Sequence, residues 1–417
     1  METAGKLKYA LAIDLGTTTL AASLVDCVSG ERLAISASLN PQRCFGADVI
    51  SRLDAAVNSH LIQKEMASLI RVELRRLGAE LCHKAGIAWV DVKQVAIAGN
   101  PAMQHILLGL DLHSLAFPPY RPKYTAGTQL KAADLEWDGD AGVYVFPMPG
   151  GFVGGDMVAF IHGAQPGEAT LCLDMGTNGE IALIAGESIW ATSAAAGPAF
   201  EGGNLSCGMA ALPGAISSVQ IEGERLHLQV IGGGQPRGIC GSAAIETVTE
   251  LLRCGILENG GRLLGADEID SNLAARLIEH QGGNAFVLYR DAQRQIMLTQ
   301  GDIRQLQLAK AALRAGIEVL AERSGIQCQA FKDVILTGSF GAVILPEWLK
   351  TLGIFDESMV QTTRFTPEGA LAGVEKALAR RDGFNEVETL ARRFRVVPLS
   401  GTPLFETLFM VHIDFPQ

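Results

Sequence analysis

The sequence predicts a two-domain α/β protein, and three observations support that fold class. The chain has 417 residues, which is more than one ordinary hydrophobic core accommodates. Short apolar strands alternate with long segments whose apolar residues recur at helical spacing. Residues 9–25 and 170–185 share one pattern: an apolar strand, Asp, one residue, Gly-Thr and a second apolar strand. Two such hairpins far apart in the chain indicate a duplicated architecture rather than a short-period repeat.

The composition excludes several classes of protein. With 48% hydrophobic and 19% charged residues, the chain is not intrinsically disordered. A net charge of −11, with no basic block, argues against a nucleic-acid surface. No uninterrupted run of about 18 apolar residues occurs, so we expect no membrane span. The first eight residues carry lysines but no small-residue cleavage site, so we expect a cytoplasmic protein without a secretory signal.

The first half of the chain opens with a predicted meander of three antiparallel strands. These strands cover Tyr9–Asp14, Leu20–Cys27 and Arg32–Leu39, with glycine-containing turns between them. A helix is predicted over His60–Gly86, because apolar residues recur there every three or four positions. A buried strand is predicted over Val92–Ala98.

The second half repeats the opening hairpin and adds further elements. Strands are predicted over Thr170–Asp174 and Glu180–Ala185. The remaining predicted elements are a hairpin over Val219–Val230, a helix over Ser242–Cys254, a helix over Ile303–Ser324 with Asp302 as its N-cap, and a buried strand over Val334–Leu336.

The first Asp-x-Gly-Thr segment carries groups that bind phosphate. Asp14 ends a strand and is followed by Gly16 and by three hydroxyl residues, Thr17, Thr18 and Thr19. Glycine lets backbone N–H groups approach a phosphate, hydroxyls donate to its oxygens, and a carboxylate holds Mg²⁺, usually through water. The alternative is a tight hairpin in which Asp and Thr serve only as turn formers.

The same arrangement recurs in the second half, at Asp174, Gly176, Thr177 and Asn178. Turn formation alone does not require Asp-x-Gly-Thr twice, so the pair favours a phosphate clamp. We therefore expect the two segments to grip a nucleotide from two sides of a cleft, with Asp14 and Asp174 sharing a metal ion.

A third glycine-containing segment follows the last predicted strand. It carries Gly338, Ser339 and Gly341, and its glycines would let a nucleobase or ribose lie flat on the backbone. The alternative is a helix N-terminus capped by Ser339. The chain contains neither a GxxxxGK[ST] loop nor a Rossmann fingerprint.

In this order the three segments resemble the phosphate 1, phosphate 2 and adenosine motifs of the actin/hexokinase/Hsp70 (ASKHA) ATPase superfamily. Residues 150–163 and 367–378, both rich in small residues, resemble its two connecting helices, which cross at the hinge between domains. The resemblance implies two ribonuclease-H-like (actin/Hsp70-type) domains around a cleft for Mg-ATP. The first would cover residues 1–165, with the C-terminal helices 366–417 returning to it, and the second residues 166–365.

Further motifs resemble one subfamily, the reductive activators of corrinoid-dependent methyltransferases and corrinoid iron–sulfur proteins. They are NPQ at 40–42, FGADVISR at 45–52, AGPAFEG at 196–202, CGM at 207–209, GICGS at 238–242 and QGDIR at 300–304. The resemblance implies an ATP hydrolase that supports the return of a Co(II) corrinoid protein to Co(I). It also implies a homodimer.

The cysteines depart from the pattern of full-length activators, which carry an iron–sulfur module beside the ATPase. The eight cysteines lie at least 14 residues apart, so the chain has no CxxC pair for a zinc knuckle or a locally held cluster. We expect reduced thiols, no iron–sulfur cluster in this chain, and electrons from a separate electron-transfer protein.

Four further charged residues attract interest. Asp156, in the first connecting helix, is expected to orient the attacking water, unless it is only a helix-surface carboxylate. Glu201, in a Gly/Ala/Pro-rich loop, is a second candidate catalytic carboxylate. Asp48 and Arg52 stand at i,i+4 spacing, which favours a structural ion pair.

Two other function classes are compatible with these residues. A small-molecule kinase of the same superfamily would transfer the γ-phosphate to a substrate hydroxyl instead of water. A non-catalytic nucleotide-gated binding module would bind ATP and turn it over negligibly. The subfamily motifs argue against the kinase.

Overall fold

A computed structural model describes residues 8–176, 178–338 and 343–417. The chain divides into two compact units, each built from three segments. The first unit comprises the chain up to Glu168 together with Ile184–Thr192 and Thr366–Val397. The second comprises Ala169–Leu183, Ser193–Phe365 and Pro398–Gln417, so the last 20 residues belong to it.

The first unit contains a six-stranded mixed sheet with the order β3-β2-β1-β4-β6-β5. The predicted three-strand meander is confirmed, because β2 pairs antiparallel with both β1 and β3. β4 lies parallel to β1, with Asp14 opposite Ala98. The strands are β1 (Tyr9–Leu15), β2 (Thr19–Asp26), β3 (Glu31–Leu39), β4 (Val92–Gly99), β5 (Thr128–Lys131) and β6 (Gly142–Val145).

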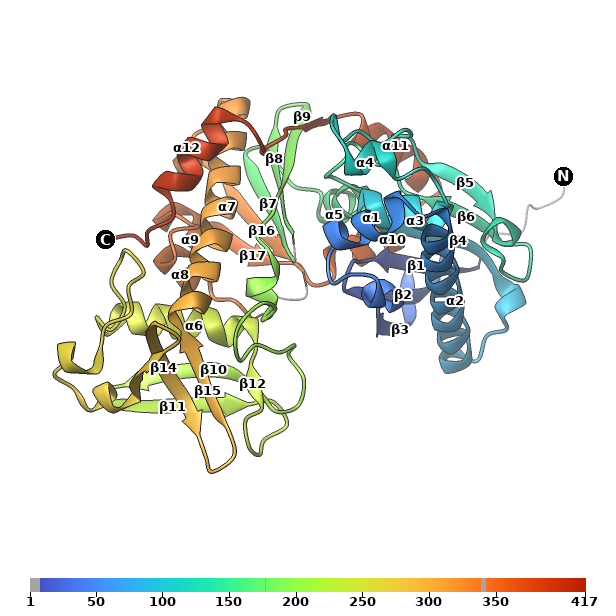
Figure 1. The fold of residues 1–417 in the computed structure, drawn as a ribbon. Coiled ribbons are helices and arrows are strands. Elements are labelled where there is room, and N and C mark those ends of the chain that lie inside the picture. The colour runs from blue at the N-terminus through green and yellow to red at the C-terminus, as the bar shows by residue number, and fades with distance from the viewer. Residues whose placement is uncertain (1–7, 177, 339–342) are drawn as a thin grey trace, which may run out of the picture. The chain divides into compact units, whose positions relative to one another are not determined.

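One face of this sheet packs against the long helix α2 (His60–Ala85), which lies beside the strands in Figure 1. Leu11, Ile13 and Leu15 alternate along β1 and are buried in one core cluster with apolar residues of α2. α2 begins after Ser59, whose hydroxyl accepts from the Ile62 N–H, and it ends at the left-handed Gly86. The predicted helix is therefore confirmed at both ends.

The opposite face of the sheet is covered by α5 (Gly155–Ala164) and α10 (Gly369–Ala379), the two predicted connecting helices. The two helices make their closest contact at glycines. A Cβ at Gly373 would clash with the carbonyl of Ala159, and a Cβ at Gly163 would lie 2.9 Å from the Gly373 nitrogen. The expected close approach of small residues is confirmed. The other helices of the unit are α1 (Val49–Val57), α3 (Pro101–Leu108), α4 (His113–Ala116) and α11 (Gly383–Ala391).

The second unit repeats the same core of strands, in the order β17-β16-β7-β8. β7 (Thr170–Met175) forms an antiparallel hairpin with β8 (Gly179–Ala185) and lies parallel to β16 (Asp333–Thr337). Asp174 stands opposite Thr337, as Asp14 stands opposite Ala98 in the first unit. The predicted duplication is confirmed at the level of strand order and direction. β17 covers Thr363–Phe365. β9 (Ser188–Ala194) pairs in parallel with β18 (Phe394–Val396), and β18 and β9 up to Thr192 are counted with the first unit.

Two small three-stranded sheets complete the second unit, with the orders β11-β10-β12 and β13-β14-β15. Their strands are β10 (Ala215–Glu222), β11 (Arg225–Val230), β12 (Gly238–Ile239), β13 (Leu277–His280), β14 (Gly283–Arg290) and β15 (Gln295–Thr299). The helices are α6 (Gly241–Arg253), α7 (Gln300–Ser324), α8 (Pro346–Thr351), α9 (Glu357–Thr362) and α12 (Pro403–Val411). The predicted hairpin over 219–230 corresponds to β10 and β11.

Helix α7 corrects one prediction. Its N-cap is Thr299, whose hydroxyl accepts from the Asp302 N–H, and Asp302 returns a carboxylate oxygen to the Thr299 N–H. Asp302 is thus the third helical residue of a capping box rather than the cap itself. Both Asp and Thr are good caps, so the sequence pattern alone did not distinguish their positions.

Within the described ranges, no helix is both long and apolar enough to cross a bilayer. The eight cysteines form no disulfide among the described residues.

Candidate nucleotide site

The first Asp-x-Gly turn joins β1 to β2 in the first unit. Asp14 lies next to the end of β1, and Leu15 pairs with Leu20 across the hairpin. A Cβ at Gly16 would clash with the carbonyl oxygen of Thr19, so the turn requires glycine. Thr18 and Thr19 are exposed at the tip. The turn therefore presents backbone and hydroxyl groups to solvent beside a strand-end carboxylate.

Two asparagine side chains stabilise this turn by hydrogen bonds. The Asn40 side-chain amide donates to the Gly16 carbonyl at 2.9 Å, and that of Asn100 donates to the Thr17 hydroxyl at 2.8 Å. The Asn100 carbonyl oxygen also accepts from the Met103 N–H and caps α3. Each asparagine begins a helical turn whose first residue is proline. The Asn-Pro pair was thus the sequence signal for these supporting residues, which the motif analysis did not assign to the site.

Asp156 lies at the same edge of the sheet, in the first turn of α5. Gly154 is packed between Asn100 and Asp156. A Cβ there would lie 2.6 Å from the Asn100 Cα and 2.8 Å from Asp156 Oδ1. Burial raises the pKa of the Asp156 carboxyl to about 6, although Oδ1 accepts from the Met157 N–H. A carboxyl with this pKa can take up and release a proton near neutral pH, as a general base does.

The expected ion pair between Asp48 and Arg52 is wrong. Asp48 caps α1, where its carboxylate accepts from the Ser51 N–H at 2.8 Å. Arg52 is fully buried, and its Nε donates to the Gly46 carbonyl at 3.0 Å. Burial lowers the pKa of Arg52 to about 10. Spacing of i,i+4 favours an ion pair only when both side chains point along the same helix face, and here the aspartate turns back to the helix end.

The second Asp-x-Gly turn joins β7 to β8 in the second unit. Asp174 precedes it, and the Gly176 N–H donates to the Asn178 carbonyl at 3.3 Å. Gly338 follows the neighbouring strand β16 with a φ of +97°. A Cβ on it would lie 2.7 Å from both Asp174 Oδ1 and the Met175 carbonyl. The second and third predicted segments thus meet at one sheet edge. Thr177, Ser339 and Gly341 lie outside the described residues.

Glu201 comes to the same turn from the 3-10 helix Pro198–Glu201. A Cβ at Gly176 would lie 3.9 Å from Glu201 Oε1. The loop around Glu201 is fixed by close backbone packing, because a Cβ at Gly241 would clash with the Phe200 carbonyl. Gly241 belongs to the GICGS motif and opens α6. The subfamily motifs at 196–202 and 238–242 therefore place a carboxylate beside Gly176.

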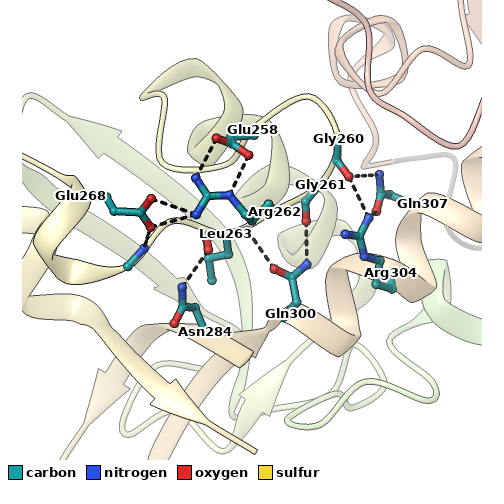
Figure 2. A network of polar contacts seen from close by, with 11 residues as sticks. Glu258, Gly260, Gly261, Arg262, Leu263, Glu268, Asn284, Gln300, Arg304 and Gln307 are labelled. Carbon is teal, nitrogen blue, oxygen red and sulfur yellow. Dashed lines mark hydrogen bonds and ion pairs between the residues drawn. The ribbon is translucent and has the colours of Figure 1, made fainter. Parts of the chain in front are cut away.

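The QGDIR motif forms the start of α7 and anchors two loops there. Asp302 Oδ1 accepts from the Ser206 N–H at 2.7 Å, which ties down the loop that follows Glu201. Figure 2 shows the second loop: Gln300 accepts from the Leu263 N–H at 2.9 Å, and Arg304 donates to the Gly260 carbonyl at 2.8 Å. Arg262 in that loop is held by carboxylates of Glu258 and Glu268. In this structure the QGDIR motif therefore holds these two loops at the start of α7.

Among the residues that the structure describes, no group of three or more His, Cys, Asp or Glu side chains is arranged to hold a metal ion. A magnesium ion bound with a nucleotide differs from such a site, because it usually keeps several waters and takes one or two carboxylates plus phosphate oxygens.

The duplicated strand core, with an Asp-x-Gly turn after the first strand of each copy, defines the actin/hexokinase-like ASKHA fold. A family model described as the C-terminal domain of RACo, the ASKHA domain, matches residues 168–417, and one described as the RACo middle region matches residues 9–165. The chain therefore belongs to the RACo family.

Individual relatives agree with this assignment. The corrinoid activation enzyme RamQ of Eubacterium limosum is 30% identical over 98% of this chain and 70% of its own length. The [Co(II) methylated amine-specific corrinoid protein] reductase of Methanosarcina barkeri is 25% identical over 83% of this chain and 65% of its own length. A solved structure titled reductive activator for corrinoid, iron-sulfur protein matches with a TM-score of 0.85, at 30% identity, over 100% of this chain and 67% of that one.

Proposed function

We propose that this chain is an ATPase that supports reductive reactivation of a corrinoid protein. One electron from a separate donor protein would convert Co(II) to Co(I), while ATP and water become ADP and phosphate. The observation that carries the proposal is the pair of Asp-x-Gly turns, each after a buried strand of a duplicated core in a RACo-family chain. The corrinoid names of both curated relatives support the substrate class.

The residues present fit a magnesium nucleotide. A Cβ at Gly16 or Gly338 would clash with the protein's own atoms, so both tight segments require glycine, the residue that glycine-rich nucleotide loops use. In this proposal Asp14 and Asp174 hold Mg²⁺, and Gly16–Thr19 with Gly176–Asn178 bind the phosphates. Gly338, Ser339 and Gly341 contact the adenosine. When bound, Mg²⁺ neutralises the charge that develops on the phosphate oxygens.

Two further carboxylates are proposed to act on water. Asp156 adjoins Asn100, which bonds to the first turn, and burial raises its pKa to about 6. Glu201 adjoins Gly176 of the second turn. In this proposal each orients a water near a phosphate bound at its own turn. Positioning of the nucleophile is one of the two contributions that a protein makes to phosphoryl transfer, beside electrostatic stabilisation.

Coupling to the corrinoid partner follows from linkage. ATP shifts the partner's state only if it binds two conformations of the activator with different affinity. Hydrolysis stimulated by the docked partner would therefore be expected, with slow turnover in its absence. We also propose that the protein works as a homodimer, which light scattering of the purified chain tests directly.

The proposal is tested with Mg-ATP, a purified Co(II) corrinoid protein and a low-potential reductant. Phosphate release and corrinoid absorbance are followed together. We expect the corrinoid protein to stimulate hydrolysis and the Co(I) spectrum to appear only with ATP. A hydrolysis rate that does not change when the corrinoid protein is added would contradict the proposal. Transfer of phosphate to a metabolite hydroxyl would also contradict it and would favour the kinase.

The metal assignment is tested by Asp14→Ala and Asp174→Ala. Each should lower turnover by about a hundredfold or more, because the phosphate charge loses its counter-ion. Asp138→Ala is the matched control, since that side chain is 94% exposed, and it should leave turnover unchanged. Full turnover in either of the first two variants would remove that residue from the metal site.

A further inference from the structure

A cavity of about 510 Å³ lies in the first unit. All of its lining residues belong to that unit, from the end of α5, from residues 184 and 189, and from α11 with the residues after it. This volume falls within the range of small-ligand sites. His162 lines it six residues after Asp156 on α5, so about 9 Å of helix axis separates the two residues.

His162 is the first polar group of this cavity. Its side chain is only 5% exposed, and among the described residues Nε2 has no hydrogen-bond partner. Burial lowers the pKa of His162, and the charge of Lys376 lowers it further. The ring is therefore neutral and offers one donor and one acceptor. Nε2 itself is buried from solvent, so the His162 ring serves as a reporter beside the cavity and not as a ligand contact.

Arg393 is the second polar group, and its guanidinium is already held in place. Nε donates to the Glu187 carbonyl at 2.9 Å, and Nη2 donates to the Gly186 carbonyl at 3.3 Å. Among the described residues these two hydrogen bonds use Nε and Nη2, and Nη1 remains for a ligand. The one carboxylate in the lining, Glu386, pairs with Arg380 at 2.8 Å. The cavity thus presents a fixed cation whose charge its own carboxylate does not offset, which favours an anion.

The remaining wall is apolar. Ile161 on α5 and Leu390 on α11 face the cavity together with Ile184 and Ile189, of which Ile189 is fully buried. Ligand sites in proteins combine apolar walls with a few placed polar groups, and both are present here. An occupant must therefore be amphipathic.

We propose that this cavity binds a small amphipathic carboxylate. Its carboxylate pairs with Arg393, and its apolar body lies against Ile161, Ile184 and Ile189. The His162 ring lines the same cavity and reports its occupation. The inference concerns a site apart from the two Asp-x-Gly turns and does not rest on the proposed function.

The test uses octanoate as the probe and full-length protein labelled at histidine for NMR. The His162 ring resonance is assigned by its loss in His162→Gln. We expect octanoate to shift this resonance saturably, while the exposed His227 resonance stays in place. Octylammonium, of the same length and opposite charge, should bind at least about tenfold more weakly. No saturable shift, or equal binding of the two probes, overturns the proposal.

Two variants locate the binding. Arg393→Met should weaken octanoate binding about tenfold, and Arg392→Met, its exposed neighbour outside the lining, should change it less than about twofold. Because Arg393 also anchors two carbonyls, a second variant keeps the test independent of folding. Thr389→Trp places a large ring into the cavity from an exposed position and should abolish binding. Octanoate binding that survives Thr389→Trp would place the ligand elsewhere.

Discussion

Asp156 is a carboxyl whose charge state changes within the working pH range. Its pKa is raised from 3.8 to about 6 because burial disfavours the ionised form. If it accepts a proton from the attacking water, ATP hydrolysis should rise as pH increases through about 6. Asp156→Asn should lower turnover by about 10²- to 10⁴-fold and remove this rise, because the amide cannot accept the proton.

The measurement is the rate of hydrolysis between pH 5 and 8 for both proteins, with nucleotide affinity as the control. The stability effect has the opposite sign. Since the folded pKa of Asp156 lies above the unfolded one, the free energy of unfolding falls as pH rises from 3.8 to about 6, and Asp156→Asn should lack that fall. A variant that keeps the wild-type pH profile would exclude Asp156 as the base.

Lys310 provides a test of stability in the second unit. It is 1% exposed, donates to the Asp414 carbonyl and lies 5.3 Å from the centre of the Phe415 ring. Burial lowers its pKa from 10.5 to about 8. The unfolded chain therefore holds the proton more tightly, so the free energy of unfolding should rise between pH 8 and 10.5, by about 3 kcal/mol at most.

Lys310→Met should lack this rise. Urea unfolding at pH 7.5 and pH 10 measures it in both proteins. Parallel changes in the two proteins would show that another group is responsible.

At the scale of elements, the crossing of α5 and α10 depends on backbone contact. A side chain at Gly373 meets the carbonyl of Ala159, so Gly373→Ala must force the helices apart. We expect it to lower the free energy of unfolding by about 2 kcal/mol. Gly167→Ala is the matched control, because a Cβ there meets nothing within 4 Å. Thermal unfolding compares the two variants, and equal stabilities would mean that the crossing is loose.

The sequence predicted the elements well and their ends less well. Periodicity identified α2 and the two hairpins, because their apolar residues face one core along many consecutive turns or pairs. It misplaced the start of α7 by assigning the cap to Asp302, since neighbouring Thr299 has the same capping chemistry. The resemblance to the ATPase superfamily identified the connecting helices, and their small residues explain why the two backbones can touch.

Candidate site residues close in sequence to a glycine turn were predictable from the sequence. The residues that hold these turns by hydrogen bonds were not. Asp174 and Gly338 came from motifs, and the structure brings them together. Asn40 and Asn100 each precede a proline, a pattern that marks a helix start, but their hydrogen bonds to the first turn depend on tertiary packing that this pattern does not encode. The cavity beside His162 was equally hidden, because its walls come from three separate stretches of chain.

At the scale of the whole molecule, the first unit is assembled from chain segments that end as late as Val397. Helix α10, which covers one face of its sheet, begins only at Gly369. A ribosome synthesises the chain from its N-terminus, so the strands β1 to β6 leave it long before that helix exists. The part of this sheet face that α10 covers therefore stays exposed while nearly the entire second unit is synthesised. The nascent chain exposes an apolar surface during that interval. We therefore expect the nascent chain to depend on chaperones until translation ends.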